Sequence, residues 1–319
     1  MGLYGTSRNF GMGKQMGFAG SQALASYYGG GHHGSQAAHS DRFGRFADWA
    51  KDEGICDLRE VDQEVVEAYG EDLRGAVDAG DISVSYAQNL VSTVNVVMEV
   101  LRGDTGAWVS PSGAVGERDN IRRDVPGGIG RDQVQAATSS MRAAGLDRAA
   151  AVVGLAREFG LRQREATLAN LGKWQADAAR CGYVNVVDGT KGGRGHEVDR
   201  WVKVTPEGAE ALARAVAASP EGSRNLLAPS EKYIGFVRGE ISAGRAHLKD
   251  AGIGKYHDLR AAYACDRYQQ LTGQAAPCAT GGLRLADGKA DMGAREVITQ
   301  ELGHGRVDVL VAYVGARRG

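Results

Sequence analysis

The sequence predicts a mainly α-helical protein with one small β-hairpin, an α+β fold that is divided between two helical domains. Three observations favour this class. Apolar residues recur at helical spacing from about residue 40 to residue 103, and again after residue 131. Between these stretches lies a segment of Pro, Gly and charged residues without an apolar period. Over residues 183–204 the apolar period changes from that of a helix to that of two strands.

Residues 1–38 are rich in Gly, Ser and Tyr, and this composition predicts a flexible N-terminal arm. The run "YYGGGHHGSQ" is typical of a segment without regular structure. Arg8, Lys14, His32 and His33 are the possible positive charges of this arm. We therefore expect the first folded domain to begin after it.

Residues 39–110 predict a small bundle of three amphipathic helices. The first, "HSDRFGRFADWAKDEG", begins with a Ser/Asp cap at Ser40 and ends at Gly54. The second is "LREVDQEVVEAYGEDLRGAVDAG" and the third is "SVSYAQNLVSTVNVVMEVLRG". Their apolar and aromatic positions recur at helical spacing, so we expect these positions to form a core and not to bind a ligand. Residues 111–130 combine Pro, Gly and charge, which predicts a linker.

Residues 131–319 predict a second, larger domain that begins with helical segments. The segments "YVNVVDG" and "DRWVKVT" then alternate like strands, and "GTKGGRGHEV" between them predicts a hairpin with a long basic tip. We expect His196, Asp199 and Arg200 near this tip to be solvated. The rest of the sequence, from "PEGAEALARAVAAS" to Gly319, predicts mainly helices with glycine-rich joins.

The composition excludes several classes of protein. A formal net charge of −1 argues against a simple polycation coated by nucleic acid. It does not exclude DNA binding through a local basic patch. No apolar run is long enough to span a membrane, and the first residues lack the order of a secretory signal. The four cysteines form no CxxC pair and complete no zinc spacing, which predicts reduced thiols in a cytoplasmic protein. These cysteines are Cys56, Cys181, Cys265 and Cys278.

Residues suited to phosphate chemistry gather in short motifs of the second domain. In "YHDLR", His257 and Arg260 stand three residues apart, so they share one helix face and can meet one target. A guanidinium offers a fork of donors that fits phosphate, and an imidazole can move a proton near neutral pH. The other motif residues are Arg162 and Glu165 in "FGLRQREATLANL", Lys191 at the hairpin tip, and His304 and Tyr313, nine residues apart, in "ELGHGRVDVLVAYVG".

These motifs and their order resemble those of the tyrosine recombinases, the phage-integrase-like enzymes that cut and rejoin DNA. In that family an Arg follows "GL" in the first box, a Lys lies on a β-hairpin, and the second box reads His-x-x-Arg, usually as "HDLR". An "LGH" follows, and the nucleophilic Tyr comes nine residues after its His. The resemblance covers residues 131–319 as a catalytic integrase domain. Residues 39–110 look like the family's helical, SAM-like core-binding domain, which binds DNA.

The resemblance implies that Tyr313 is the nucleophile and that its attack leaves a 3′-phosphotyrosyl bond and a free 5′-hydroxyl. Such a bond keeps the energy of the phosphodiester without a nucleotide cofactor. Because a phenol has a pKa of about 10, forming a phenolate at neutral pH costs roughly 4 kcal/mol. The resemblance places His257 where it would assist proton transfer from Tyr313 or orient it. It makes Lys191 the general acid that protonates the leaving 5′-oxygen.

The transition state gathers negative charge on the non-bridging oxygens, and the implied site meets this charge with cationic donors. Arg162 and Arg260 can each grip two oxygens, and His304 would donate a further hydrogen bond. Glu165 is expected to hold an arginine or a helix in place. The implied chemistry uses no metal ion and no cofactor, because the arginines stand where a two-metal nuclease would place its ions.

Each assignment has a structural alternative. Arg162 can be a surface ion-pair partner of Glu165, and His257 can have a structural role alone. His304, between two glycines, can be a helix C-cap, and Tyr313 can be a core tyrosine beside "VLVA". Further rivals are Arg194 and Lys203 for the place of Lys191, and Tyr256, Tyr263 and Tyr268 for the place of Tyr313.

Double-stranded DNA is the partner that the resemblance implies. The two domains would clamp it mainly through phosphate contacts, so binding should weaken steeply with salt. The N-terminal arm is then either a disordered tail or a basic arm that lies along the DNA. The family also implies a homo-tetramer on two DNA sites, with accessory DNA-bending proteins, in the cytoplasm at the nucleoid. The expected backbone contacts are Arg118, Arg122, Arg123 and Arg194.

Two features depart from the family pattern. The interval between "HDLR" and "LGH" is longer than usual, and residues 273–295 look like an insertion without an assigned role. Only six residues follow Tyr313, where many relatives carry a further C-terminal helix that docks on the neighbouring subunit. The sequence therefore does not show how subunits would be linked.

The predicted function is that of a site-specific tyrosine recombinase that integrates or excises a mobile element. One alternative with the same chemistry is a type IB topoisomerase-like enzyme, which cuts and reseals DNA without exchanging strands. An alternative from another class is a catalytically idle DNA-binding regulator that kept the fold. The intact set of motif residues argues against this regulator. A metal-dependent nuclease would need an acidic cluster that the sequence lacks.

Overall fold

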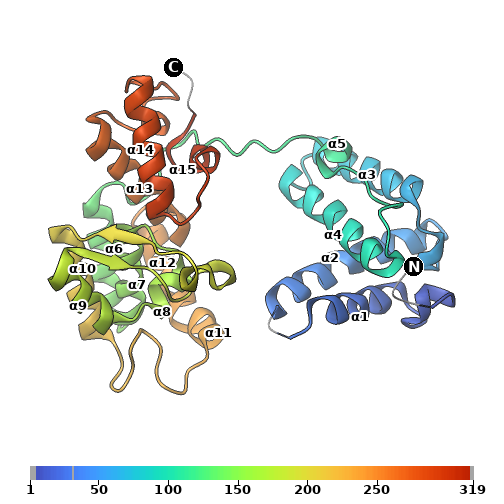
Figure 1. The fold of residues 1–319 in the computed structure, drawn as a ribbon, viewed down its shortest axis with the longest axis horizontal. Coiled ribbons are helices and arrows are strands. Elements are labelled where there is room, and N and C mark those ends of the chain that lie inside the picture. The colour runs from blue at the N-terminus through green and yellow to red at the C-terminus, as the bar shows by residue number, and fades with distance from the viewer. Residues whose placement is uncertain (1–4, 31, 317–319) are drawn as a thin grey trace. The chain divides into compact units, whose positions relative to one another are not determined.

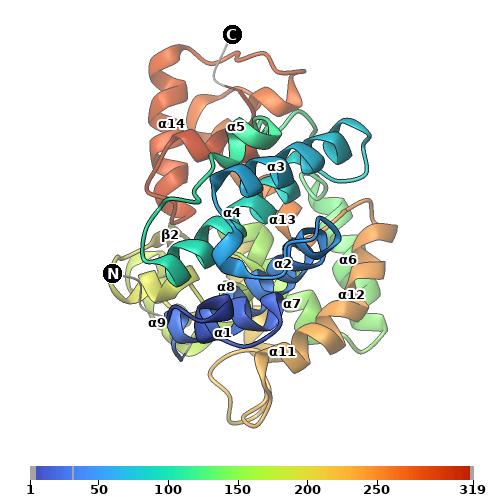
Figure 2. The same ribbon diagram turned by 90° about the vertical axis from the view of Figure 1, so that its right-hand side faces the viewer.

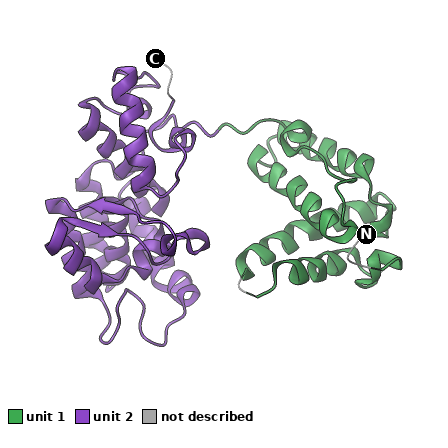
Figure 3. Cartoon of the chain, in the orientation of Figure 1, with its two compact units in different colours: residues 1–119 green, residues 120–319 purple. Residues whose placement is uncertain are grey.

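The computed structural model describes residues 5–30 and 32–316, and the chain forms two compact units (Figure 3). Unit 1 comprises residues 1–119 and unit 2 comprises residues 120–319. Helices build most of both units, and the strands among the described residues form one two-stranded antiparallel sheet. This architecture confirms the predicted fold class, a mainly helical protein with a small hairpin. Within the described ranges, no helix combines the length and the apolar character that a membrane span requires.

Unit 1 is a bundle of helices around one long central helix. Its elements are η1 (Arg8–Gly11), α1 (Met16–Tyr28), α2 (His33–Asp52), η2 (Leu58–Glu60), α3 (Gln63–Asp78), α4 (Val84–Arg102) and α5 (Pro111–Val115). The central helix α4 is buried on most sides because α1, α2, α3 and α5 all pack against it. Ser83 caps its first turn by accepting a hydrogen bond from the backbone N–H of Tyr86. Helix α1 lies along α2 (Figures 1 and 2).

The N-terminal segment is folded, which corrects the expectation of a flexible arm over residues 1–38. Helix α1 buries Ala23 and Leu24 completely. Its glycines allow close helix packing, since a Cβ on Gly20 would lie 2.2 Å from the ring of Phe43 on α2. The small residues that suggested disorder thus bring two helices together. Residues 1–4 and 31 of this segment lie outside the described residues.

The chain before α1 is also anchored, and the helix after α1 begins earlier than predicted. Asn9 is fully buried, and its side chain accepts a hydrogen bond from the backbone N–H of Leu58 at 2.8 Å. Asp57 in turn accepts a hydrogen bond from the backbone N–H of Asn9 at 2.8 Å. Helix α2 begins at His33 and not at the predicted cap Ser40. The first helix of the predicted bundle is therefore longer than its apolar period indicated.

The predicted linker over residues 111–130 is partly folded into unit 1. The hydroxyl of Ser110 caps α5 by accepting from the backbone N–H of Gly113. Val115 is buried, and α5 packs on α3 and α4. Upstream of α5, the side chain of Asn95 holds both the N–H and the C=O of Val109. These contacts keep the chain on unit 1 up to its end at residue 119.

Unit 2 is built around α7, against which α6, α10 and α13 pack. Small and branched apolar residues cover most of α7, so neighbouring helices approach it from several sides. The elements of unit 2 are α6 (Arg131–Ala143), α7 (Asp147–Phe159), α8 (Gln163–Leu168), α9 (Leu171–Cys181), β1 (Tyr183–Asn185), η3 (Lys191–His196), β2 (Trp201–Lys203), α10 (Pro206–Ala218), α11 (Tyr233–Phe236), the π-helical turn η4 (Val237–Ile241), α12 (Ser242–Asp250), α13 (Tyr256–Thr272), η5 (Pro277–Ala279), α14 (Gly288–Glu301), η6 (Asp308–Leu310) and α15 (Val311–Val314).

The predicted hairpin is confirmed by an antiparallel pair of short strands. Val184 of β1 lies opposite Val202 of β2, and both are fully buried. Tyr183 and Trp201 point to the other face and are exposed, as the period of two requires. The tip of the hairpin contains the short turn η3, which carries Lys191. The hairpin thus extends a basic tip from a strand pair that packs on α9.

The predicted insertion over residues 273–295 divides into a loop and the start of a helix. The loop contains η5 and ends where Asp287 caps α14 by accepting from the backbone N–H groups of Lys289 and Ala290. Helix α14 packs beside α13 (Figure 1). Arg295 of α14 is fully buried and donates hydrogen bonds to the carbonyl of Gly315. The insertion therefore contacts the segment that follows Tyr313.

Candidate active site

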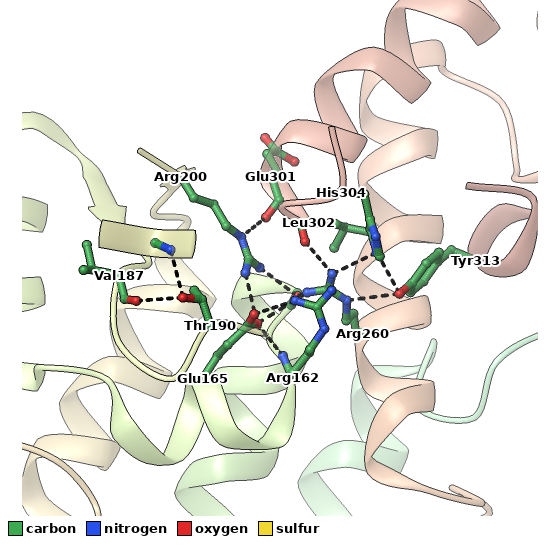
Figure 4. A network of polar contacts seen from close by, with 12 residues as sticks. Arg162, Glu165, Val187, Thr190, Arg200, Arg260, Glu301, Leu302, His304 and Tyr313 are labelled. Carbon is green, nitrogen blue, oxygen red and sulfur yellow. Dashed lines mark hydrogen bonds and ion pairs between the residues drawn. The ribbon is translucent and has the colours of Figure 1, made fainter. Parts of the chain in front are cut away.

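Segments from three distant parts of the sequence bring most of the predicted site residues together (Figure 4). Arg162 and Glu165 lie at the start of α8, and Arg260 lies in the first half of α13. His304 follows α14, and Tyr313 lies on α15. The turn between α7 and α8 is tight, because Gly160 has φ +62° and a Cβ there would lie 2.4 Å from Tyr263. The carbonyl of Gly160 accepts hydrogen bonds from Arg200 and Arg260.

Glu165 is the shared acidic partner of three arginines. It is fully buried, and its carboxylate lies 2.6 Å from Arg162, 3.0 Å from Arg200 and 3.5 Å from Arg260. It also accepts a hydrogen bond from the backbone N–H of Arg162 at 2.7 Å, which fixes the first turn of α8. Burial alone would raise the pKa of Glu165, but the guanidiniums of Arg200, Arg260 and Arg162 outweigh burial and lower it. Glu165 is therefore ionised.

Arg200 is buried, which corrects the expectation that it is solvated. Its side chain donates to the carbonyls of Glu301 at 2.6 Å and Gly160 at 3.2 Å, in addition to its ion pair with Glu165. Arg200 directly precedes β2, so by strand alternation it shares the inward face with Val202. The strand alternation, which places residue 200 on the inward face, can be seen in the sequence. The burial of a charged side chain on that face is explained only by the ion-pair and hydrogen-bond partners that the structure shows. Arg200 ties the hairpin to the segments before α8 and after α14.

Arg260 is completely buried and directs its donors to several segments. It donates to the carbonyls of Gly160 and Leu302, and its Nη2 lies 3.1 Å from Nε2 of His304. Its Nε donates to the hydroxyl of Tyr313 at 3.4 Å. Burial, with the nearby Arg200, lowers the pKa of Arg260 to about 10, so it remains a cation at neutral pH.

Tyr313 has only 5% of its surface exposed, and its hydroxyl lies 2.9 Å from Nε2 of His304. Arginine has no acceptor, so Nε2 of His304 must accept from Arg260 and the ring proton must lie on Nδ1. The Tyr313 hydroxyl can then accept from Arg260 and donate to His304. Burial and the cations Arg260 and Arg162 lower the pKa of His304 to about 3, which keeps the ring neutral.

His257 and Lys191 approach the same centre from two sides. The ring of His257 lies 5.4 Å from the ring of Tyr313, which is a ring contact rather than a hydrogen bond. Burial and the nearby Arg260 lower the pKa of His257, so it is also neutral near pH 7. Lys191 is exposed at the hairpin tip and lines a pocket of about 670 Å³ together with Arg162 and His304. The structure therefore gathers all the predicted motif residues around one centre.

The predicted backbone contacts fall into two groups. Arg194 is exposed and lines the pocket of Lys191, beside Gly305. Arg123 is exposed as well. The side chain of Arg118 instead contacts Gln88 and Asn89 of α4, and Arg122 forms an ion pair with Asp258 at 2.9 Å. Arg118 and Arg122 thus hold the chain to the surface of its own units.

The unfolding free energy is expected to fall as the pH falls from about 6.5 towards 3, because the folded protein resists protonation of His304. The folded pKa of about 3 lies below the ordinary histidine value of about 6.5. The unfolded chain therefore binds more protons in this window, and stability rises with pH. When the unfolding free energy from urea titrations is plotted against pH, the slope should be shallower for His304→Gln than for the parent. His196→Gln, at an exposed position of the hairpin tip, is the control and should keep the parent's slope. Equal slopes for the parent and His304→Gln would contradict this account.

The sequence of residues 129–266 matches the model of a family described as Integrase. These residues form most of unit 2, which we therefore call the integrase unit. The match contains the first box, the hairpin and the second box of this integrase unit, and it ends before His304 and Tyr313. No curated protein matches the chain.

The fold of the chain is similar to that of the Tn1549 transposon integrase, which was solved in complex with transposon right end DNA. The similarity has a TM-score of 0.52 and covers 93% of this chain and 95% of that chain, with 11% sequence identity. At this identity the likeness establishes a shared fold. The similarity extends over unit 1 as well as over the integrase unit.

Proposed function

We propose that this integrase-family protein is a site-specific recombinase that cuts and rejoins double-stranded DNA through a covalent bond between Tyr313 and a 3′-phosphate. The observation that carries the proposal is the contact of the Tyr313 hydroxyl with His304 at 2.9 Å and with Arg260 at 3.4 Å. His304 also lines the pocket of Arg162 and Lys191, so the hydroxyl adjoins a space that several basic side chains line. A tyrosine that only packs in the core would not require an arginine and a histidine next to its hydroxyl.

The charge of the site supports a phosphodiester as its ligand. Three guanidiniums surround the single carboxylate of Glu165, so positive charge exceeds negative charge within a mostly buried site. Arg162 has the most accessible side chain of this cluster, at 31% exposure, and would meet a non-bridging oxygen directly. Arg260 has its donors occupied by Gly160, Leu302, His304 and Tyr313. A bound phosphate would take over the positions that the Tyr313 hydroxyl and His304 hold on Arg260 when DNA is absent.

The proton of the nucleophile has a direct acceptor in His304. Its Nε2 is unprotonated and lies 2.9 Å from the hydroxyl, within the range for proton transfer. The ring is a weak base without DNA, because burial and the neighbouring cations lower its pKa. The negative charge of a bound phosphodiester would raise that pKa and strengthen the base. His257 would then orient Tyr313 through its ring contact instead of taking the proton.

Lys191 is proposed as the general acid for the leaving 5′-oxygen. The hairpin tip is held by Thr190, whose hydroxyl donates to the carbonyl of Val187 and accepts from the N–H of Gly195. Gly192 and Gly193 directly follow Lys191 and both have positive φ values, a conformation that suits glycine. The tip can therefore present the ammonium group to the pocket that it already lines. Arg194 is proposed to contact the phosphate backbone beside it.

The partners follow from the proposed chemistry. Unit 1 is proposed to be a core-binding domain that, with the integrase unit, holds duplex DNA, as the DNA complex of the structurally similar transposon integrase suggests. Strand exchange between two sites needs several active sites, which favours a homo-tetramer on DNA. The same similarity favours integration or excision of a mobile element as the biological role.

Covalent trapping tests the proposal. The full chain is mixed with negatively supercoiled plasmid, quenched with SDS, and examined for protein bound covalently to nicked or relaxed DNA. An adduct, together with recombinant products on DNA that carries its attachment sites, is the expected result. Relaxation without recombinant products would assign a topoisomerase-like activity instead. DNA binding without any adduct, on plasmid and attachment-site DNA alike, would overturn the proposed chemistry and leave a DNA-binding regulator.

A further inference from the structure

Two buried thiols lie directly behind the proposed nucleophile. Cys265 on α13 and Cys278 in η5 are each only 2% exposed, and their Sγ atoms are 3.5 Å apart. Both Sγ atoms also face the main-chain carbonyl of Tyr313, at 3.5 Å and 3.8 Å. The other two cysteines, Cys56 and Cys181, are exposed and separate. The buried pair therefore joins the second-box helix, the start of the insertion and the segment that carries Tyr313.

We propose that Cys265 and Cys278 form a reversible oxidation site, which hydrogen peroxide converts into a disulfide and thereby displaces Tyr313. The position of the pair indicates a regulatory role in addition to packing. Both sulfurs contact the main-chain carbonyl of Tyr313, so a chemical change at the sulfurs acts directly on the Tyr313 backbone. The disulfide itself is independent of the proposed function. Its effect on DNA cleavage rests on that function.

The two thiols differ in pKa, and this difference determines which of them is oxidised first. The hydrogen bond from Cys265 lowers the pKa of Cys278, and the guanidiniums of Arg122 and Arg295 lower it further. The same hydrogen bond and burial raise the pKa of Cys265. Because a thiolate is the reactive form of cysteine, Cys278 is the sulfur that peroxide oxidises first, and Cys265 is the resolving thiol.

The oxidation balances in two steps. The Cys278 thiolate attacks one oxygen of hydrogen peroxide, the O–O bond breaks, and the departing hydroxide takes up a proton to give water. The sulfur of Cys265 then attacks the sulfenic sulfur of Cys278, the S–O bond breaks, and the hydroxyl leaves as a second water with the thiol proton of Cys265. Two thiols are oxidised and one peroxide is reduced to two waters. Dithiothreitol reverses the reaction by thiol–disulfide exchange.

The disulfide would disturb the segment that carries Tyr313 in two ways. The Sγ atoms would move from 3.5 Å to the bonding distance of about 2.05 Å, and neither sulfur would keep a hydrogen to donate to the Tyr313 carbonyl. The chain just after Tyr313 is packed tightly against Cys278, since a Cβ on Gly315 would lie 2.7 Å from the Cys278 nitrogen. A shift of about 1 Å at a reacting group can lower a rate about 10²-fold, and we expect a loss of this order in cleavage.

Peptide mapping of the oxidised protein is the first test. The full chain is treated with hydrogen peroxide, its remaining thiols are blocked, and a Cys265–Cys278 linked peptide is sought by mass spectrometry. The linked peptide should form and should disappear with dithiothreitol. Oxidation of the exposed Cys56 and Cys181 without this linked peptide would overturn the proposal. This measurement needs neither a variant nor DNA.

Covalent trapping with peroxide-treated protein is the second test. The adduct of the parent should fall about 10²-fold after peroxide and return with dithiothreitol. Cys278→Ser should keep its adduct after peroxide, whereas the Cys56→Ser, Cys181→Ser double variant should respond like the parent. A linked peptide with an unchanged adduct would overturn the displacement of Tyr313. An adduct that is absent even from the reduced parent would contradict the proposed function and leave the oxidation site to the mapping result.

Discussion

Tyr313→Phe is expected to abolish the covalent protein–DNA adduct while leaving DNA binding unchanged. Phenylalanine keeps the ring contacts with His257, His304 and Arg260, so the fold of α15 should persist. It removes the oxygen that would bond to phosphorus. Loss of a nucleophile lowers turnover by a factor on the order of 10⁶ in a well-studied covalent enzyme, so the adduct should fall below detection. SDS trapping on supercoiled plasmid, with DNA affinity measured in parallel, gives both quantities.

Tyr256→Phe is the matched control for this substitution. Tyr256 is also buried, but its hydroxyl donates to the carbonyl of Ile241 and has no contact with the arginine cluster among the described hydrogen bonds. This variant should form the adduct like the parent. An adduct that survives in Tyr313→Phe would redirect the search to Tyr263 and Tyr268, whose hydroxyls contact Glu301 and Asp291.

Arg260→Lys is expected to lower the rate of adduct formation by about 10²–10³-fold, the loss that follows removal of one preorganised transition-state donor. A lysine ammonium is a single point of charge and cannot reach the carbonyls of Gly160 and Leu302 and the hydroxyl of Tyr313 together. Because lysine keeps the positive charge of Arg260, the salt dependence of DNA binding should change little. Single-turnover trapping gives the rate, and thermal unfolding reports any loss of fold.

Arg267→Lys is the matched control for Arg260→Lys, because it also replaces an arginine on α13. It tests whether the loss of adduct formation is specific to Arg260. Arg267 lies on the same helix and forms an ion pair with Glu301 at 2.9 Å, and none of the described hydrogen bonds joins it to Tyr313. Its variant should cleave at nearly the parent rate. An Arg260→Lys variant that is stably folded and cleaves at the rate of Arg267→Lys would show that Arg260 has only a structural role.

Regular amphipathic helices and short motifs were the parts of this protein that the sequence predicted well. The apolar periods of the second and third predicted helices lead directly to α3 and α4. The change of period near Tyr183 leads to the hairpin. The motif spacing placed Arg260 and Tyr313 on different segments that the fold brings into contact. In these segments the local sequence preferences favour the same conformation that the tertiary structure adopts.

The features that the sequence did not predict depend on contacts between distant segments. Helix α1 has little apolar period, and its place in the core depends on close packing against α2, where Gly20 meets Phe43. The burial of Arg200 depends on Glu165 and on the carbonyls of Gly160 and Glu301, none of which lies near it in the sequence. The acceptor role of His304 follows from the donor that Arg260 directs at it. No local pattern encodes these contacts.

The arginine cluster also ties the chemistry to the completion of folding. The partners of Arg260 come from the end of α7, from the loop after α14 and from α15, so they meet only when the whole integrase unit has assembled. A partly folded molecule has the same tyrosine but lacks the surroundings that would activate it. In the proposed mechanism, the capacity to nick DNA therefore depends on an intact integrase unit, and a molecule that loses the fold of this unit loses the activity with it.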